Sequence, residues 1–254
     1  MNQTIAELVR RRDPDRFLTA LFAPPDKRDA LLTLYAFNHE LARAREVVSQ
    51  PPLALIRLQW WREVVEGAQR RHEVAEPLLA AIEQGELDRD DLSALIDARE
   101  IEAEPFIETL SAWRDYLMAS AGGLAVAAAR LLGGAEPEAF RSLGAAYGAA
   151  GLLRSVPLLA RAQRCMLPAD VLARHELSPE AVIAHPDIRN VLRQLADEAC
   201  EWLRAPPRIQ RHAIAAALPA VLARRDLCRA IQAPRRRGLG DRLAVVVAGL
   251  AGRV

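Results

Sequence analysis

Residues 143–168 read LGAAYGAAGLLRSVPLLARAQRCMLP and are the most informative segment of this chain for its fold. Its first half is built mainly from Ala, Gly and Leu, and Ala and Leu are among the residues most compatible with a helix. We expect a helix from about Glu136-Pro137 to Arg154, with Pro157 as its stop, because proline inside a helix removes a backbone hydrogen bond. A loop ending in Leu167-Pro168 follows.

The sequence on both sides of this stretch is also typical of helices. Apolar residues make up 51% of the chain and Ala and Leu dominate them, which favours helix over sheet. Helical periodicity bounded by Pro, Gly or Asp predicts helices over 25–49, 53–71 and 105–132, the last interrupted or closely packed at Gly122-Gly123. No linker is long or polar enough to divide the chain, so we predict one all-α domain over residues 1–254.

Charge and cysteine usage narrow the classes of function. The formal net charge of +1 gives no electrostatic basis for binding nucleic acid. Cys165, Cys200 and Cys228 lack the spacing of a zinc site and indicate a reducing compartment. The N-terminus carries no secretion-type apolar run, and no segment offers about 18 consecutive apolar residues. We therefore expect a soluble cytoplasmic protein.

Four segments in the same order resemble the squalene/phytoene synthase family. They are 15–48, 92–106, 113–133 and 143–168. The resemblance implies the isoprenoid synthase fold, a bundle of helices around a central cavity. In active members, two pairs of aspartates at the cavity mouth hold the Mg²⁺ that neutralises a diphosphate leaving group.

The metal-binding positions of that family are altered in this sequence. Matching Tyr35-Ala36-Phe37 to the family's Tyr-Ala-Phe places Ala42 and Glu46 at the first aspartate pair. Counting back from Leu167-Pro168 places Ser155 and Leu159 at the second pair. Alanine and leucine offer no oxygen, and a serine hydroxyl is a weak neutral ligand.

The resemblance therefore implies vestigial active-site positions and no catalytic residue. His39 takes the place of a family arginine and belongs to the same vestigial set. Glu46 is either a surviving metal ligand or half of a solvated ion pair. No cofactor is expected, and Mg²⁺ would be needed only by an active enzyme whose ligands have moved elsewhere.

Three arginines are candidates for binding an anionic group. Arg43 lies where metals would sit, and Arg154 and Arg164 flank the altered second segment. Arginine can hold a phosphate without a metal. The alternative is that these side chains cap helix ends or pair with surface acids.

A narrower resemblance favours one branch of the superfamily. AFNHELA at 36–42, RLQWW at 57–61 and LRSVP at 153–157 are similar to the non-catalytic branch, which includes an assembly factor for mitochondrial respiratory complex I. This implies an assembly or maturation factor whose partner is a respiratory subunit or another assembly factor. Two alternatives stay open: an active head-to-head prenyl diphosphate transferase with atypical metal ligands, and a non-catalytic binder of an isoprenoid or lipid.

The C-terminus suggests a membrane contact. Arg235-Arg236-Arg237 precede an apolar stretch from Leu243 to Gly252. Such a segment could lie on an anionic membrane surface, with arginines at the phosphates. It could equally be a last core helix with a solvated basic lead-in. Peripheral attachment at an inner membrane is thus a second expectation for location.

Overall fold

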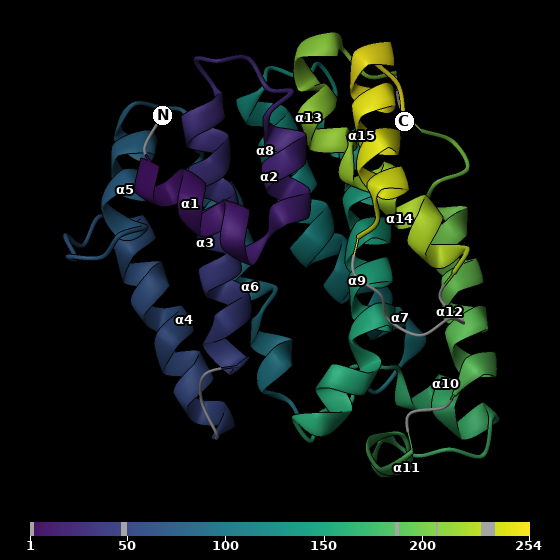
Figure 1. Cartoon of the computed structure of the whole chain (residues 1–254). Coiled ribbons are helices and arrows are strands. Elements are labelled where there is room, and N and C mark those ends of the chain that lie inside the picture. The colour runs from purple at the N-terminus through teal and green to yellow at the C-terminus, as the bar shows by residue number, and fades with distance from the viewer. Residues whose placement is uncertain (1–2, 47–49, 186–187, 207, 230–236) are drawn as a thin grey trace.

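The computed structural model, described for residues 3–46, 50–185, 188–206, 208–229 and 237–254, is a bundle of α-helices (Figure 1). Within these ranges the secondary structure is helical, and no β-strand is present. The prediction of an all-α protein is confirmed. The first nine α-helices are α1 (Gln3–Arg12), α2 (Pro14–Ala20), α3 (Arg28–Glu46), α4 (Pro51–Glu66), α5 (Ala75–Glu83), α6 (Arg89–Asp97), α7 (Leu110–Leu117), α8 (Gly123–Leu131) and α9 (Arg141–Arg161).

The second part of the chain contains shorter helices. They are α10 (Ala169–Arg174), α11 (Pro179–Ala184), α12 (Arg189–Glu201), α13 (Ile214–Ala217), α14 (Pro219–Leu227) and α15 (Leu239–Ala251). Several helices begin at residues that cap free backbone N–H groups. Asp13 accepts from the N–H of Arg16 at the start of α2, and Thr109 accepts from the N–H of Ala112 at the start of α7.

The helix expected from Pro105 begins later than predicted. Ile107 instead forms an isolated bridge with Pro168 and accepts a hydrogen bond of 2.8 Å from the N–H of Ala169. This pairing keeps the chain extended until Thr109 caps α7. The predicted interruption near Gly122 is confirmed, because Met118–Gly122 forms a π-helical turn between α7 and α8.

The prediction that Pro157 stops its helix is wrong. α9 continues through Pro157 and ends at Arg161. Val156 and Ala160 are buried on either side of the proline, so tertiary packing outweighs the lost backbone hydrogen bond. With the turn before it, Pro137–Arg161 is also long and apolar enough to cross a membrane by composition, although its apolar window is 50% buried, as in a core helix.

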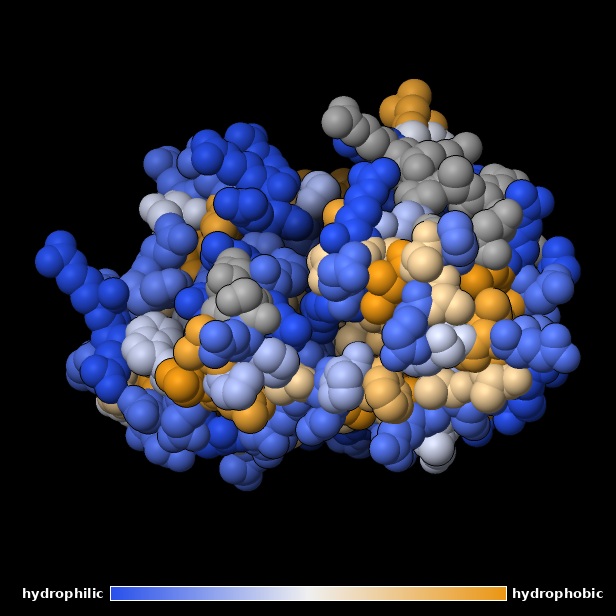
Figure 2. Space-filling view, turned by 90° about the horizontal axis from the view of Figure 1, so that it is seen from below, coloured by the Kyte–Doolittle hydropathy of each residue, from blue (hydrophilic) through white to orange (hydrophobic). Residues whose placement is uncertain are grey.

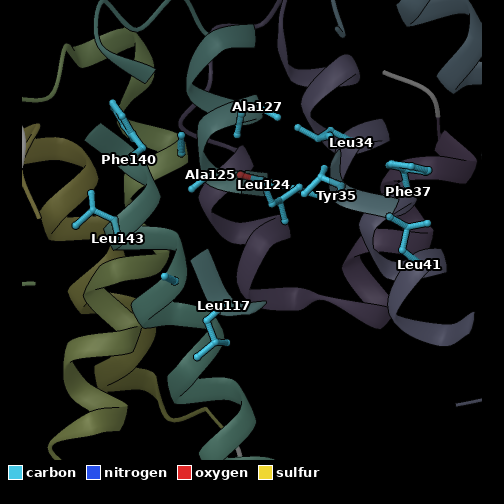
Figure 3. Close-up of a cluster of buried hydrophobic side chains, with 14 of the residues drawn as sticks. Leu34, Tyr35, Phe37, Leu41, Leu117, Leu124, Ala125, Ala127, Phe140 and Leu143 are labelled. Carbon is cyan, nitrogen blue, oxygen red and sulfur yellow. The ribbon is translucent and has the colours of Figure 1, made fainter. Parts of the chain in front are cut away.

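The centre of the bundle is formed by α3. Every residue from Ala30 to Asn38 is buried, and a helix that is buried on all sides must be surrounded by other helices. Figure 3 shows Leu34 and Tyr35 of α3 directed toward Leu124 of α8. Phe140 lies on the far side of this cluster. The core therefore links the two halves of the chain.

Close backbone packing sets the position of α9. A Cβ atom added at Gly144 would lie 2.6 Å from the Cβ of Ala125, and one added at Gly148 would lie 2.5 Å from the Cβ of Ala121. Only glycine allows this approach to the π-helical turn and α8. This approach fixes α9 so that Ser155 and Leu159 in its C-terminal half line the same cavity as residues of α3.

Candidate functional site

A central cavity of about 380 Å³ brings the predicted vestigial positions together. Its lining includes all five of them: His39, Ala42, Glu46, Ser155 and Leu159. α3 supplies the first three and α9 supplies the other two. Positions more than 100 residues apart in sequence thus face one space, as the family spacing predicted.

These positions present little that could hold a metal. Ala42 contributes only a methyl group, and the Ser155 hydroxyl donates to the Gly151 carbonyl oxygen over 2.8 Å within α9. Leu159 is half-buried and apolar. Throughout the described ranges, no group of three or more His, Cys, Asp or Glu residues could hold a metal ion. The donor set therefore does not fit a magnesium cluster.

A buried polar network forms one wall of the cavity. Arg99 donates to Glu102 over 2.6 Å and to Asn38 over 2.9 Å. The Tyr116 hydroxyl donates to the same Glu102 oxygen over 2.7 Å. Burial raises the pKa of Tyr116, and the neighbouring Glu102 raises it further. Burial disfavours the charged form of Arg99, but Glu102 and Tyr116 outweigh this and raise its pKa. Within this network, Arg99 and Glu102 form an ion pair in which each side chain neutralises the charge of the other.

A second network joins four distant segments at the cavity. Arg237 donates to Asp15 over 2.8 Å and to Asp226 over 2.6 Å. Arg154 reaches the other oxygen of Asp226 at 3.0 Å, and the Tyr147 hydroxyl donates to Asp15 over 3.2 Å. Arg154 is thus engaged by an acid, as the alternative to anion binding proposed. Arg237 points inward and is 12% exposed. The prediction that it could lie at membrane phosphates is therefore wrong. Arg235 and Arg236 lie outside the described residues.

Arg16, on α2, is another cation of the cavity lining. It pairs with Asp13 at 2.8 Å and lies over the rings of Tyr35 and Tyr147, at 5.7 and 4.9 Å from their centroids. Such cation–π contacts stabilise a buried guanidinium. Arg16 is therefore neutralised where it lies.

Arg43 and Arg164, the two remaining candidates for anion binding, differ in whether an acid pairs with them. Arg43 donates to the buried carboxylate of Glu40 over 2.9 Å and is directed to that partner. Arg164 lines the cavity, and among the described residues no carboxylate lies within ion-pairing distance of it. Its guanidinium is 3.6 Å from the sulfur of Met166. Burial lowers the pKa of Arg164, which reflects the cost of this placement.

His39 and Glu46 lie at the edge of the altered site. The Nε2 atom of His39 is buried and has no hydrogen-bond partner in the part of the chain that the structure describes. Burial lowers the pKa of His39, so the neutral imidazole predominates at pH 7. Glu46 is exposed at the last position of α3. Neither residue has the surroundings of a metal ligand.

Several lining residues were not predicted from the sequence. Arg99, Glu102 and Tyr116 lie in segments that resemble the family, whereas Asp226 lies well beyond them on α14. Their pairing depends on the fold. The i, i+3 spacing of Arg99 and Glu102 was the only local signal. Among the candidate arginines, Arg164 is thus the one that lines the cavity with no carboxylate in ion-pairing distance in the described part of the chain.

Comparisons with known proteins agree with this geometry. The family described as squalene/phytoene synthase matches residues 9–245. The mouse protein named NADH dehydrogenase (ubiquinone) complex I, assembly factor 6 is 28% identical over 227 residues, covering 85% of this chain and 68% of the mouse protein. The human protein of the same name is 26% identical over the same coverage.

Two solved structures share the fold. The squalene synthase HpnC from Alicyclobacillus acidocaldarius has a TM-score of 0.68 and 16% identity, covering 99% of this chain and 94% of that chain. A dehydrosqualene synthase crystallised with a ligand has a TM-score of 0.71 and 15% identity, covering 97% and 94%. The predicted isoprenoid synthase-like bundle is therefore confirmed.

Proposed function

Because the chain belongs to the squalene/phytoene synthase family, we propose that it is a catalytically inactive member acting in the assembly or maturation of a membrane respiratory complex of the complex I type. The names of its mouse and human relatives support this role. Its partner is then a subunit or another assembly factor of that complex.

One observation carries the proposal of inactivity. The fold and cavity are retained, but Ala42, Ser155 and Leu159 stand at three of the four positions where active relatives are expected to bind metal. Ionising a prenyl diphosphate requires strong neutralisation of the leaving group, which the family achieves with bridging Mg²⁺. The cavity instead contains arginines that are mostly paired with its own acids.

The first test is the release of pyrophosphate. Purified protein is incubated with Mg²⁺ and with geranyl, farnesyl and geranylgeranyl diphosphates, and its folded state is verified by a cooperative thermal transition. We expect release at the background rate for each substrate. Release well above background that disappears in Glu46→Gln would show an active transferase with atypical ligands.

The second test addresses the role in assembly. Deleting the gene in its source organism is expected to reduce the amount of assembled NADH dehydrogenase complex on native gels. Complementation with the wild-type chain and with Glu46→Gln should restore the complex equally, since no metal chemistry is required. Normal assembly in the deletion strain would contradict the proposed role.

Arg164 supports a second candidate function, the metal-independent binding of an anionic isoprenoid or lipid. This cation faces a cavity that also contains Leu117, Leu152 and Met166. A ligand that binds only the folded state raises the unfolding temperature. Farnesyl diphosphate in the presence of EDTA should therefore stabilise the wild-type protein and not Arg164→Met, and an absence of stabilisation would leave the assembly role alone.

A further inference from the structure

The outward side of α15 is an apolar stripe. Leu239, Leu243, Val247 and Leu250 are 73%, 52%, 64% and 66% exposed. Their spacing of four, four and three residues places them on one side of a helix. Over 11 residues the stripe extends about 16 Å along the helix. α15, drawn in yellow, lies along the outside of the bundle (Figure 1).

The opposite side of α15 is firmly attached to the protein. Asp241 accepts hydrogen bonds from Arg225 over 2.8 Å and Arg229 over 3.0 Å. Val245 is fully buried, and a Cβ atom at Gly249 would lie 2.5 Å from the ring of Phe22. These contacts fix the orientation of the helix, so the apolar stripe is held toward solvent. A helix that is apolar on both sides requires something to cover its outer side.

The charges around the stripe are positive. Asp241 is the only acid in α15, and it is buried against its two arginines. A groove of about 560 Å³ beside the stripe includes Arg224 and Arg253, and no acidic side chain is among its described lining residues. Arg242 is exposed on the helix itself. The partner of this surface is therefore both apolar and negatively charged.

Other exposed apolar residues lie on other helices. They include Leu53, Leu55 and Ile56 on α4 and Leu158 on α9. Seen from below, the molecule carries apolar residues on both halves, with hydrophilic residues around them (Figure 2). Ile56 provides a control position, because it is 64% exposed and belongs to another helix, α4.

We propose that α15 docks this protein on the surface of a bilayer that contains anionic lipids. Leu239, Leu243, Val247 and Leu250 enter the interfacial layer, and Arg242 and Arg253 contact the lipid phosphates. A second copy of the chain fits poorly, because it would place the same arginines against each other. The docking surface does not depend on the proposed role in assembly.

Vesicle flotation tests this surface directly. The full-length protein should float with phosphatidylcholine vesicles that contain phosphatidylglycerol and remain unbound with phosphatidylcholine alone. Leu243→Asp/Val247→Asp should abolish binding, and Arg242→Gln/Arg253→Gln should weaken it about 30-fold, from about 1 kcal/mol per arginine. Ile56→Asp should bind as the wild type does. Because the replaced residues are exposed, each variant should keep the wild-type unfolding temperature.

Four results would overturn the proposal. The first is no flotation of the wild type with anionic vesicles. The second is unchanged flotation of Leu243→Asp/Val247→Asp. The third is that the wild type does not bind vesicles but forms a dimer in analytical ultracentrifugation, and that Leu243→Asp/Val247→Asp is a monomer. The stripe would then be an interface between two copies of the chain. Loss of a soluble protein partner in the double variant, again without vesicle binding, would assign the stripe to a protein.

Discussion

The Arg99 guanidinium donates to the Glu102 carboxylate over 2.6 Å beside the central cavity, where Glu102 is buried and Arg99 is largely buried. Tyr116 donates to the same carboxylate oxygen, so a single acid neutralises a cation and satisfies a hydroxyl. The cavity wall thus carries its own counter-ions. A protein arranged in this way retains a folded cavity without a metal.

Replacing Glu102 by Gln should be strongly destabilising. The charge of Arg99 would be left buried, and breaking a buried pair from one side costs about 3–5 kcal/mol. Arg99→Met/Glu102→Gln should cost less than Glu102→Gln alone, since no stranded cation remains and glutamine can still accept from Tyr116. Urea unfolding at pH 7 measures both values. A double variant that is less stable than Glu102→Gln would argue against this account.

Two glycines of α9 should respond oppositely to alanine. At Gly144 a Cβ atom meets the Cβ of Ala125 at 2.6 Å, so Gly144→Ala should lower the free energy of unfolding by about 3 kcal/mol. At Gly151 no atom lies within 4 Å of the added Cβ, and Gly151→Ala should stabilise by up to about 1 kcal/mol through helix propensity. Thermal unfolding of the pair distinguishes packing from propensity, and equal effects would refute the close approach of α9.

The anchor of α15 should be sensitive to acid. Burial opposes ionisation of Asp241, but hydrogen bonds from Arg225 and Arg229 outweigh it and hold its pKa below the ordinary 3.8. Because the folded-state pKa is lowered, this stabilisation is complete well above pH 4 and is lost as the pH falls below about 4.

Asp241→Asn provides the matching measurement. At pH 7 it should lower the free energy of unfolding by about 2 kcal/mol, since Arg225 and Arg229 are partly exposed and regain water. The difference from the wild type should shrink as the pH is lowered from about 5 toward 3. A difference that stays constant over this range would mean that Asp241 contributes by packing alone.

Arg164 should show a conflict between stability and binding. Its cation is partly buried near Met166 with no carboxylate in pairing distance among the described residues, so Arg164→Met should stabilise the free protein by about 1 kcal/mol. Arg154→Met is the contrasting variant, because it breaks the ion pair with Asp226 and should destabilise. If both variants destabilise equally, Arg164 has a structural role.

Local sequence patterns predicted the helices and the altered metal positions. The family resemblance places Ala42 through the match at Tyr35-Ala36-Phe37, and it places Ser155 and Leu159 by counting back from Leu167-Pro168. Helix ends near prolines were less predictable. Pro157 lies inside α9 because burial of Val156 outweighs a lost hydrogen bond, and tertiary packing of this kind is invisible to local rules.

The charge pairs of the cavity could not be predicted from spacing. Asp226 pairs with Arg237 and also with Arg154, which is 72 residues earlier in the sequence. The sequence offers no local sign of the contact between Arg154 and Asp226. The basic run before α15 permits either a membrane contact or a solvated lead-in to a core helix, whereas Arg237 turns inward to Asp15 and Asp226. The sequence shows that α15 is rich in apolar residues. It does not show which side of the helix packs against the protein and which side is left exposed as the stripe.

The contact between Asp15 and Arg237 joins positions 222 residues apart. During synthesis, Asp15 leaves the ribosome long before Arg237 exists, and domains of this size emerge over many seconds. The ring of charges around the cavity can close only when nearly the whole chain is available. Until then the acids and arginines of the early helices lack their last counter-ion, which makes this cluster a late step of folding and exposes the incomplete chain to chaperones and proteases.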